Sequence, residues 1–267
     1  MLVIFKRLFR DRLPALVLFS IIGALFIFLY FLFYPLVVQQ QDAIRGFMQS
    51  LPQVMLKAFG IEDLNIFSFE GFLAYKHYNT TLPLLYIFLL TGLAGSALSG
   101  EIERSTIETP LACPVSRLRM FFGIYAAGIL TLAVFTIVAV LSVLPLGQLL
   151  GIEYVGRFHW QIAGLGLLFG WALFSLAVLV SAVCSQIRRT YVIMGGLLIV
   201  MYIIYLTAVT VSSLDWLKYF SLFGYFEPNY ILRTNHFSYI ALYVYSAVAI
   251  TCTALGAYRF VKRDICL

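Results

Sequence analysis

Charged side chains are scarce in this chain. Only 11% of its 267 residues are Asp, Glu, Lys or Arg, whereas about 25% is typical of a soluble domain. Hydrophobic residues make up 62%. This composition excludes an ordinary soluble enzyme, a disordered protein and a nucleic-acid-binding domain with a basic exposed surface. The net charge of +6 therefore needs an explanation other than nucleic acid.

Several motifs of catalytic and energy-coupling sites are also missing. The sequence has no GxxxxGK[ST] phosphate loop and no HExxH zinc motif. None of the four cysteines falls in a predicted outer loop, so we expect no disulfide. No charged residue is predicted well inside a span, and pumps usually carry such groups there. The three histidines, near predicted outer edges, show no metal-ligand spacing: His77, His159 and His236. We therefore expect no metal, no cofactor and no enzyme activity on this chain alone.

Six long stretches are free of charge, and each is 24 to 33 residues long. A membrane helix needs about 20 mostly apolar residues, so each stretch holds one span. Helices are expected because the backbone must satisfy its own hydrogen bonds in lipid. The sequence thus predicts an all-α integral membrane protein, one domain over 1–267, with spans near 13–38, 79–100, 119–144, 161–185, 190–212 and 237–258.

Basic residues indicate the orientation. Six spans put both termini on one side, and the segments on that side hold 12 basic residues against 6 on the other. Because short cytoplasmic segments are enriched in Lys and Arg, both termini are predicted to be cytoplasmic. Residues 1–12 fit either an interfacial helix or a disordered basic anchor, and the sequence does not choose between them.

Two outer segments are long enough to have structure of their own. Residues 39–79 show helical spacing interrupted by a capping box at Ser50–Gln53, which predicts two short helices meeting there. Residues 213–233 are aromatic and broken by Gly224 and Pro228. That composition suits a membrane interface or a segment that dips back into the membrane.

The longest inner loop, residues 100–119, begins GEIERSTIETPLACPVSR. Ser105 to Glu108 form a capping box, in which the Ser105 hydroxyl accepts from the Glu108 N–H. This predicts a short helix from Thr106, ended by Pro114. A capped helix here is either a mechanical contact for a cytoplasmic partner or simply a well-capped turn.

The same stretch, with Gly95 and Ser96 before it, resembles the ABC transporter permeases of the second type, the drug and polysaccharide exporter family. That family shows E-x-E-x-G-T-[LI]-E followed by L-x-x-x-P-V-S-R. The chain departs from the pattern at Ser105, where the family has Gly, and at Ile124, where it often has Lys. The matching positions are Glu101, Glu103, Thr106, Ile107, Glu108, Leu111, Pro114, Val115, Ser116 and Arg117.

The resemblance implies the permease subunit of an ATP-driven exporter in the cell (plasma or inner) membrane. Such a permease pairs with a second, identical or paralogous permease and with two cytoplasmic ATPase subunits, which bind the ATP and Mg. The loop 104–114 would be the coupling helix that docks on the ATPase. The implied coupling residues are Glu101, Glu103, Arg104, Ser105, Thr106, Ile107, Glu108, Leu111, Pro114, Ser116 and Arg117.

The substrate cannot be read from the residues. The expected pathway is apolar and aromatic with scattered hydroxyls, which favours an amphipathic small molecule, peptide or lipid over a bare ion. Its candidate residues are Tyr86, Thr91, Gly95, Ser96, Tyr202, Tyr205, Thr207 and Thr210. An alternative is a non-transporting membrane assembly or immunity partner. An intramembrane enzyme is disfavoured, because the catalytic side chains are missing.

Overall fold

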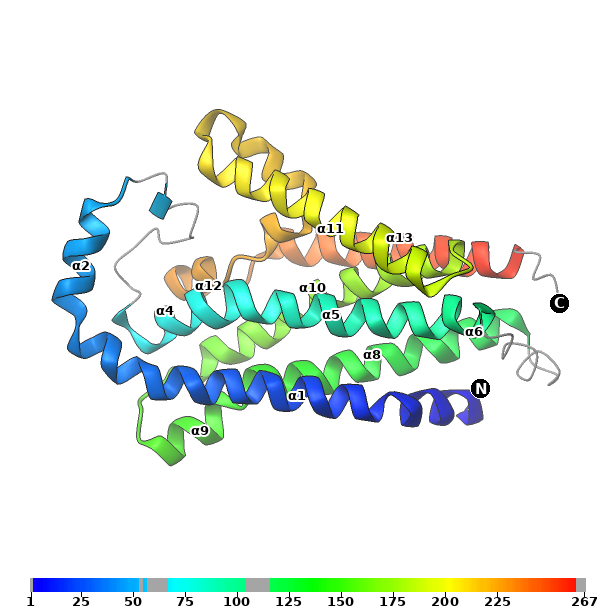
Figure 1. The fold of residues 1–267 in the computed structure, drawn as a ribbon, viewed down its shortest axis with the longest axis horizontal. Coiled ribbons are helices and arrows are strands. Elements are labelled where there is room, and N and C mark those ends of the chain that lie inside the picture. The colour runs from blue at the N-terminus through cyan, green and yellow to red at the C-terminus, as the bar shows by residue number, and fades with distance from the viewer. Residues whose placement is uncertain (1, 53–54, 57–66, 104–115, 263–267) are drawn as a thin grey trace.

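The computed structural model describes residues 2–52, 55–56, 67–103 and 116–262. Within that part the chain is helical and has no strands, as Figure 1 shows. Six helical stretches are long and apolar enough to cross a membrane: Phe9–Gln39, Phe69–Ser99, Arg117–Leu150, Gly156–Val183, Ile187–Thr210 and Tyr239–Lys262. The predicted all-α, six-span fold is confirmed.

The first span belongs to one unbroken helix, α1, which covers Leu2–Gln39 and includes Pro14 and Pro35. Residues 2–12 therefore continue the helix of the first span and form no separate interfacial helix. A second helix, α2 (Gln41–Ser50), follows directly and has no buried residues. The Ser50 hydroxyl donates to the Phe47 carbonyl at 2.6 Å, inside α2. The predicted partner helix lies outside the described residues, apart from residues 55–56.

The second span is part of a longer helix built from five consecutive segments. They are α4 (Phe69–Leu73), the π-helix η2 (Ala74–Thr81), α5 (Leu82–Ala94), the π-helix η3 (Gly95–Ser99) and α6 (Gly100–Glu103). It begins at Phe69 rather than near residue 79, because Phe69–Leu73 are mostly buried and the exposed Lys76 lies within η2. A π-segment adds a residue to a helical turn, and such bulges often mark functional sites.

The remaining elements complete the bundle. They are α8 (Arg117–Leu141), α9 (Val143–Leu150), α10 (Gly156–Val183), α11 (Ile187–Thr210), the 3₁₀ segments η4 (Ser212–Phe220) and η5 (Leu222–Tyr225), α12 (Pro228–Thr234) and α13 (Tyr239–Lys262). The predicted aromatic segment at 213–233 thus consists of η4, η5 and α12. Gly224, within η5, allows that segment to pack against η4, because a Cβ there would lie 2.1 Å from the Lys218 carbonyl oxygen.

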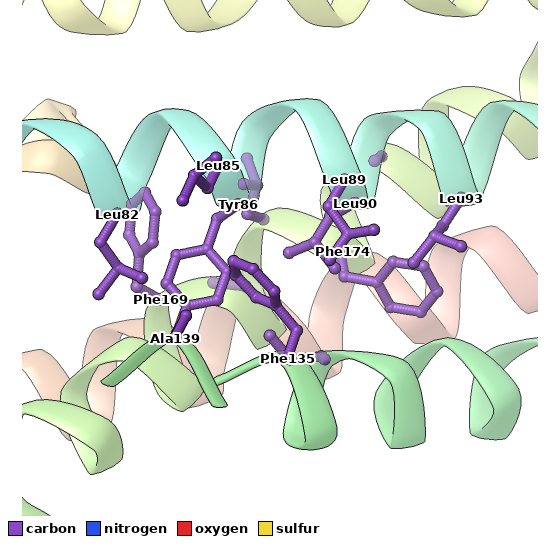
Figure 2. Close-up of a cluster of buried hydrophobic side chains, with 14 of the residues drawn as sticks. Leu82, Leu85, Tyr86, Leu89, Leu90, Leu93, Phe135, Ala139, Phe169 and Phe174 are labelled. Atoms are coloured by element: carbon purple, nitrogen blue, oxygen red, sulfur yellow. The ribbon is translucent and has the colours of Figure 1, made fainter. Parts of the chain in front are cut away.

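Helix α10 lies at the centre, where it packs against α13, α8 and α5. Figure 2 shows side chains of α5, including Tyr86, packed with Phe135 of α8 and Phe169 of α10. Gly170 lets the helices approach, because a Cβ there would lie 2.4 Å from Leu132 Cδ1. Small residues let membrane helices approach one another closely, and they are enriched where such helices pack.

The two ends of the bundle carry different elements (Figure 1). The start of α1, the end of α13 and α6 lie together at what we call the α6 end. Helices α2, α4 and α12 lie at the opposite end, the α4 end. Helix α11 starts at the α6 end and diverges from the bundle along its length, and η4 folds back along α11. Only four residues of α11 are buried: Thr190, Met194, Leu198 and Ala208.

Candidate functional site

The π-helix η3 comes just before α6 and the inner loop, and a serine from α10 is inserted into its backbone ladder. The Ser99 N–H donates to the Ser181 hydroxyl at 3.1 Å, and that hydroxyl donates to the Ala94 carbonyl at 2.8 Å. Ala94 and Ser99 are five residues apart, the spacing of a π-helical hydrogen bond. Ser181 of α10 therefore completes the second-span helix at the point where its register changes.

Helix α11 joins the same chain of hydroxyls. Thr190 Oγ1 donates to Ser99 Oγ at 3.1 Å, and Ser99 Oγ donates to the Gly95 carbonyl at 2.7 Å. Ser99, Ser181 and Thr190 are all buried. Buried hydroxyls are costly unless bonded, so this chain of bonds ties α11, η3 and α10 together.

Helix α1 is attached on another side through a charged residue. Arg12 Nη1 donates to the Leu93 carbonyl and to Ser96 Oγ, both at 2.6 Å. The Ser96 hydroxyl donates in turn to the Gly92 carbonyl at 2.6 Å. A long basic side chain can place its charge at the membrane edge while its stem packs on apolar surface. Arg12 thus belongs to this site and is more than an orientation signal.

The last residue of α6 reaches the start of α11. Glu103 Oε2 accepts from the Ile187 N–H at 2.8 Å. Ile187 is the first residue of α11, so its N–H has no acceptor within its own helix. A carboxylate is favourable at a helix N-terminus because the aligned peptide dipoles are positive there. We call the contacts of Arg12, Ser96, Ser99, Ser181, Thr190 and Glu103 the η3 junction.

Two glycines allow α11 to lie close against η3. A Cβ at Gly95 would lie 2.7 Å from Tyr191 Cε1, and a Cβ at Gly100 would lie 3.0 Å from Ile187 Cδ1. On the same helix, a Cβ at Gly92 would meet nothing within 4 Å. The close approach is therefore local to the η3 junction.

Most of the predicted coupling residues lie outside the described residues: Arg104, Ser105, Thr106, Ile107, Glu108, Leu111 and Pro114. Glu101 is placed only as a member of α6. Ser116 begins α8, where its hydroxyl accepts from the Arg119 N–H at 3.4 Å. Arg117 Nη1 donates to the Val261 carbonyl at 3.4 Å, so the loop returns to the bundle beside the end of α13. The coupling role of all these residues stays a prediction.

The predicted pathway residues are brought together only in part. Gly95 and Ser96 lie in the η3 junction. Tyr86 lies in the apolar core of Figure 2, and its hydroxyl pairs with Thr136 Oγ1 at 2.8 Å. Thr91 is buried, and its hydroxyl has no partner among the described residues. These positions do not share one cavity among the described residues, and their role stays a prediction.

The α11 members of that set face different surroundings. Tyr202 is half-exposed, and its ring lies 5.6 Å from that of Phe223. Thr207 and Thr210 donate to carbonyls of α11 itself. Tyr205 lines a cavity of about 490 Å³ at the α4 end, bounded by α11, η4 and α12.

A second junction, missed by the sequence analysis, lies at the α4 end. The hydroxyl of Tyr78, in η2, pairs with His159 Nδ1 of α10 at 2.7 Å. His77 Nε2 pairs with the Ala139 carbonyl of α8 at 3.1 Å. All three side chains are fully buried. We call them the η2 junction. In the described part of the chain no cluster of three or more His, Cys, Asp or Glu could hold a metal.

Comparison with known proteins agrees with the fold. The chain matches the model of a family described as ABC-2 family transporter protein over residues 2–265, which is nearly its full length. No curated protein sequence matches the chain. The family is a membrane transport component rather than a catalytic subunit, which accords with six apolar helices. The chain therefore belongs to the ABC-2 transporter family, as a multi-pass membrane permease.

Proposed function

We propose that the chain is the permease subunit of an ATP-driven exporter of the inner membrane. Two cytoplasmic ATPase subunits would bind ATP and Mg and dock on the loop 104–114. A second permease, identical or paralogous, would complete the complex. The transported molecule would be amphipathic: a small molecule, a peptide or a lipid.

The η3 junction is the observation that carries this proposal. It lies directly before the loop on which an ATPase would act, and it bonds the second-span helix to α1, α10 and α11. Glu103 extends the same link to the first residue of α11. A displacement of the loop would therefore pull on three further helices at once.

Charge supports the α6 end as the cytoplasmic one. The described helices begin or end there with Arg10, Arg12, Arg117, Arg119, Arg188, Arg189, Arg259 and Lys262. Fewer basic residues belong to the α4 end, among them Arg45, Lys76, Arg157, Lys218 and Arg233. Cytoplasmic segments are the ones enriched in Lys and Arg. Both termini would then be cytoplasmic.

The exposed apolar surface of α1 and α11 leaves room for a second permease. Large apolar side chains on α11 are exposed along most of its length, including Val192, Ile199 and Ile203. On α1 the exposed set includes Val17, Ile21 and Leu32. In a membrane such faces meet lipid or another helix, and pairing through them would put two copies side by side.

The first test is purification of the tagged chain in mild detergent, followed by an ATPase assay. We expect an ATPase subunit to co-purify and its activity to depend on this chain. Replacing Thr106, Ile107 and Glu108 together by Ala should release the ATPase without loss of expression. A chain that purifies alone would argue for the non-transporting assembly partner, and an intact complex after the triple replacement would remove the coupling role of 104–114.

A matched pair of threonines tests the η3 junction itself. Thr190→Val removes the hydroxyl that bonds to Ser99, whereas Thr131→Val removes a buried hydroxyl that bonds only to Ala127 of its own helix. A hydrogen bond between membrane helices is worth about 0.6–2 kcal/mol. We expect Thr190→Val to lower permease-dependent ATP hydrolysis several-fold and Thr131→Val to leave it near the parent value. Equal effects of the two variants would mean that the η3 junction does not link the ATPase to the spans.

A further inference from the structure

The cavity at the α4 end is lined by charged residues as well as apolar ones. It is bounded by the last turns of α11, by η4 and by α12, and its volume of about 490 Å³ falls within the about 300–1,000 Å³ typical of small-molecule sites. Its wall carries two acids and two bases, Asp215, Glu227, Lys218 and Arg233. Its formal charge is therefore zero, with both signs present.

The charges come from two elements of the cavity wall. Lys218 and Asp215 lie on η4 and are paired at 2.9 Å. The pKa of Lys218 is raised, chiefly because its ammonium donates to Asp215, so Lys218 is charged at neutral pH. Glu227 and Arg233 belong to the start and end of α12. A ligand in the cavity would thus meet both signs of charge within one site.

Three aromatic residues also line the cavity. Tyr205 comes from α11, Phe226 precedes α12 and Tyr230 lies on α12. The faces of such rings attract cations, and groups of rings bind quaternary ammonium ligands. Glu227 follows Phe226 directly, so a carboxylate and aromatic residues line the same part of the cavity.

The cavity also lies at the end of the fifth span. Helix α11, the fifth span, ends at Thr210, and η4, which carries Asp215 and Lys218, begins at Ser212. Tyr205, Ala208 and Val209 contribute the apolar part of the wall from the last turns of α11. A molecule with a polar headgroup and an apolar chain fits this division.

We propose that this cavity binds an amphiphile with a zwitterionic headgroup, an anionic group joined to a quaternary ammonium, with its alkyl chain along the last turns of α11. The ammonium would lie by Glu227 and the aromatic rings, and the anionic group by Lys218. The site supplies a ligand class for the exporter proposed above, but its binding needs no ATPase and is measured without one.

The test uses three fluorescent amphiphiles with one alkyl chain and different headgroups: phosphocholine, trimethylammonium and sulfate. Their binding to the purified full chain in maltoside micelles is followed by fluorescence anisotropy. We expect saturable binding of the phosphocholine probe, about tenfold tighter than that of either singly charged probe, which corresponds to about 1.4 kcal/mol.

Two charge variants should give opposite patterns. Lys218→Gln should weaken the phosphocholine and sulfate probes about tenfold and spare the trimethylammonium probe. Glu227→Gln should weaken the phosphocholine and trimethylammonium probes and spare the sulfate probe. Arg157→Gln, an exposed charge on the same side but outside the cavity, is the matched control and should change nothing.

A third variant separates loss of binding from loss of folding. Val209→Trp would fill the apolar part of the cavity and should abolish saturable binding of all three probes, while the Tm of the protein stays near the parent value. Equal affinity for the three headgroups, or unchanged binding in Lys218→Gln, Glu227→Gln and Val209→Trp, would overturn the proposed site. Loss of the site with an intact ATPase complex would leave the permease proposal standing.

Discussion

At the α6 end, the second-span helix meets its neighbours through hydroxyls and glycines, whereas at the α4 end it meets them through rings. In the η3 junction Ser99 is bonded to Ser181 and to Thr190 at 3.1 Å each, and the close approach of α11 needs Gly95. The η2 junction joins Tyr78 and His159 at 2.7 Å within an aromatic cluster. Both junctions coincide with a π-segment of one helix.

The two kinds of contact differ in how easily they can rearrange. Rings bury a large area and interlock, so a shift at the η2 junction must displace several of them together. Hydroxyls contribute little packing area, and their bonds can be exchanged for bonds to the carbonyl four residues back in their own helix. We therefore expect the α6 end of the second-span helix to shift more easily than the α4 end.

The largest expected effect is at the ring junction. Tyr78→Ala deletes a fully buried ring and leaves His159 Nδ1 without its partner. Loss of a large buried ring costs about 3–5 kcal/mol. We expect a clear fall in Tm in detergent, measured by intrinsic fluorescence. Tyr239→Ala, which removes a ring that is 70% exposed, is the control and should leave the Tm almost unchanged. A similar Tm for both variants would mean that the α4 end is not fixed by its rings.

A smaller effect is expected from Gly95→Ala, and it should fall on coupling more than on Tm. The added methyl would lie 2.7 Å from Tyr191 Cε1, so the Tyr191 ring on α11 must shift. Overpacking of this kind costs about 1–3 kcal/mol. We expect reduced permease-dependent ATP hydrolysis, and recovery in the double variant Gly95→Ala, Tyr191→Ala. Gly92→Ala, with open space around its added methyl, is the matched control. Failure of the double variant to recover would place the defect elsewhere than the η3–α11 contact.

The smallest effect concerns the two carboxylates at the ends of the second-span helix. Glu70 accepts from the Val155 N–H at 2.6 Å, just before α10, as Glu103 does from the Ile187 N–H at the start of α11. A partly exposed carboxylate at a helix N-terminus is worth about 0.3–1 kcal/mol. We expect Glu70→Ala and Glu103→Ala each to speed exchange of the bonded amide hydrogen about two- to fivefold.

Gln in place of either Glu is the control for that measurement, because its carbonyl oxygen can still accept the bond. If Glu103→Ala speeds exchange at Ile187 but Glu70→Ala does not speed it at Val155, the two ends also differ in how their carboxylates protect the bonded amide. Faster exchange in the Gln variants as well would show that charge, and not the hydrogen bond, protects the amide.

The sequence was sufficient for the spans and insufficient for the contacts between them. Each membrane crossing needs about 20 apolar residues. The stretches without charge therefore identify the spans, whichever helices pack against one another. The second-span helix extends back to Phe69, before the predicted span, and this was not evident because Lys76 and His77 interrupt the apolar stretch. Only the folded chain buries His77 against Ala139.

Much of the η3 junction was equally out of reach. Gly95, Ser96 and Glu103 were singled out from the motif, but Ser181 and Thr190 are 82 and 91 residues away from Ser99 along the chain. In η3 the Ser181 hydroxyl lies between the Ala94 carbonyl and the Ser99 N–H, and tertiary packing places that hydroxyl there. One signal was available: Ser181 and Thr190 flank the short turn between the fourth and fifth spans.

The π-geometry of η3 also affects the direction in which the following segment points. In an α-helix each residue turns the chain by about 100°, and a π-segment is an α-helix carrying one surplus residue. Returning the surplus residue to the α-helical register, by withdrawal of the Ser181 hydroxyl from between Ala94 and Ser99, would swing everything beyond it about the helix axis. The segment that follows η3 could in this way point in two directions while the rest of the span stays in place.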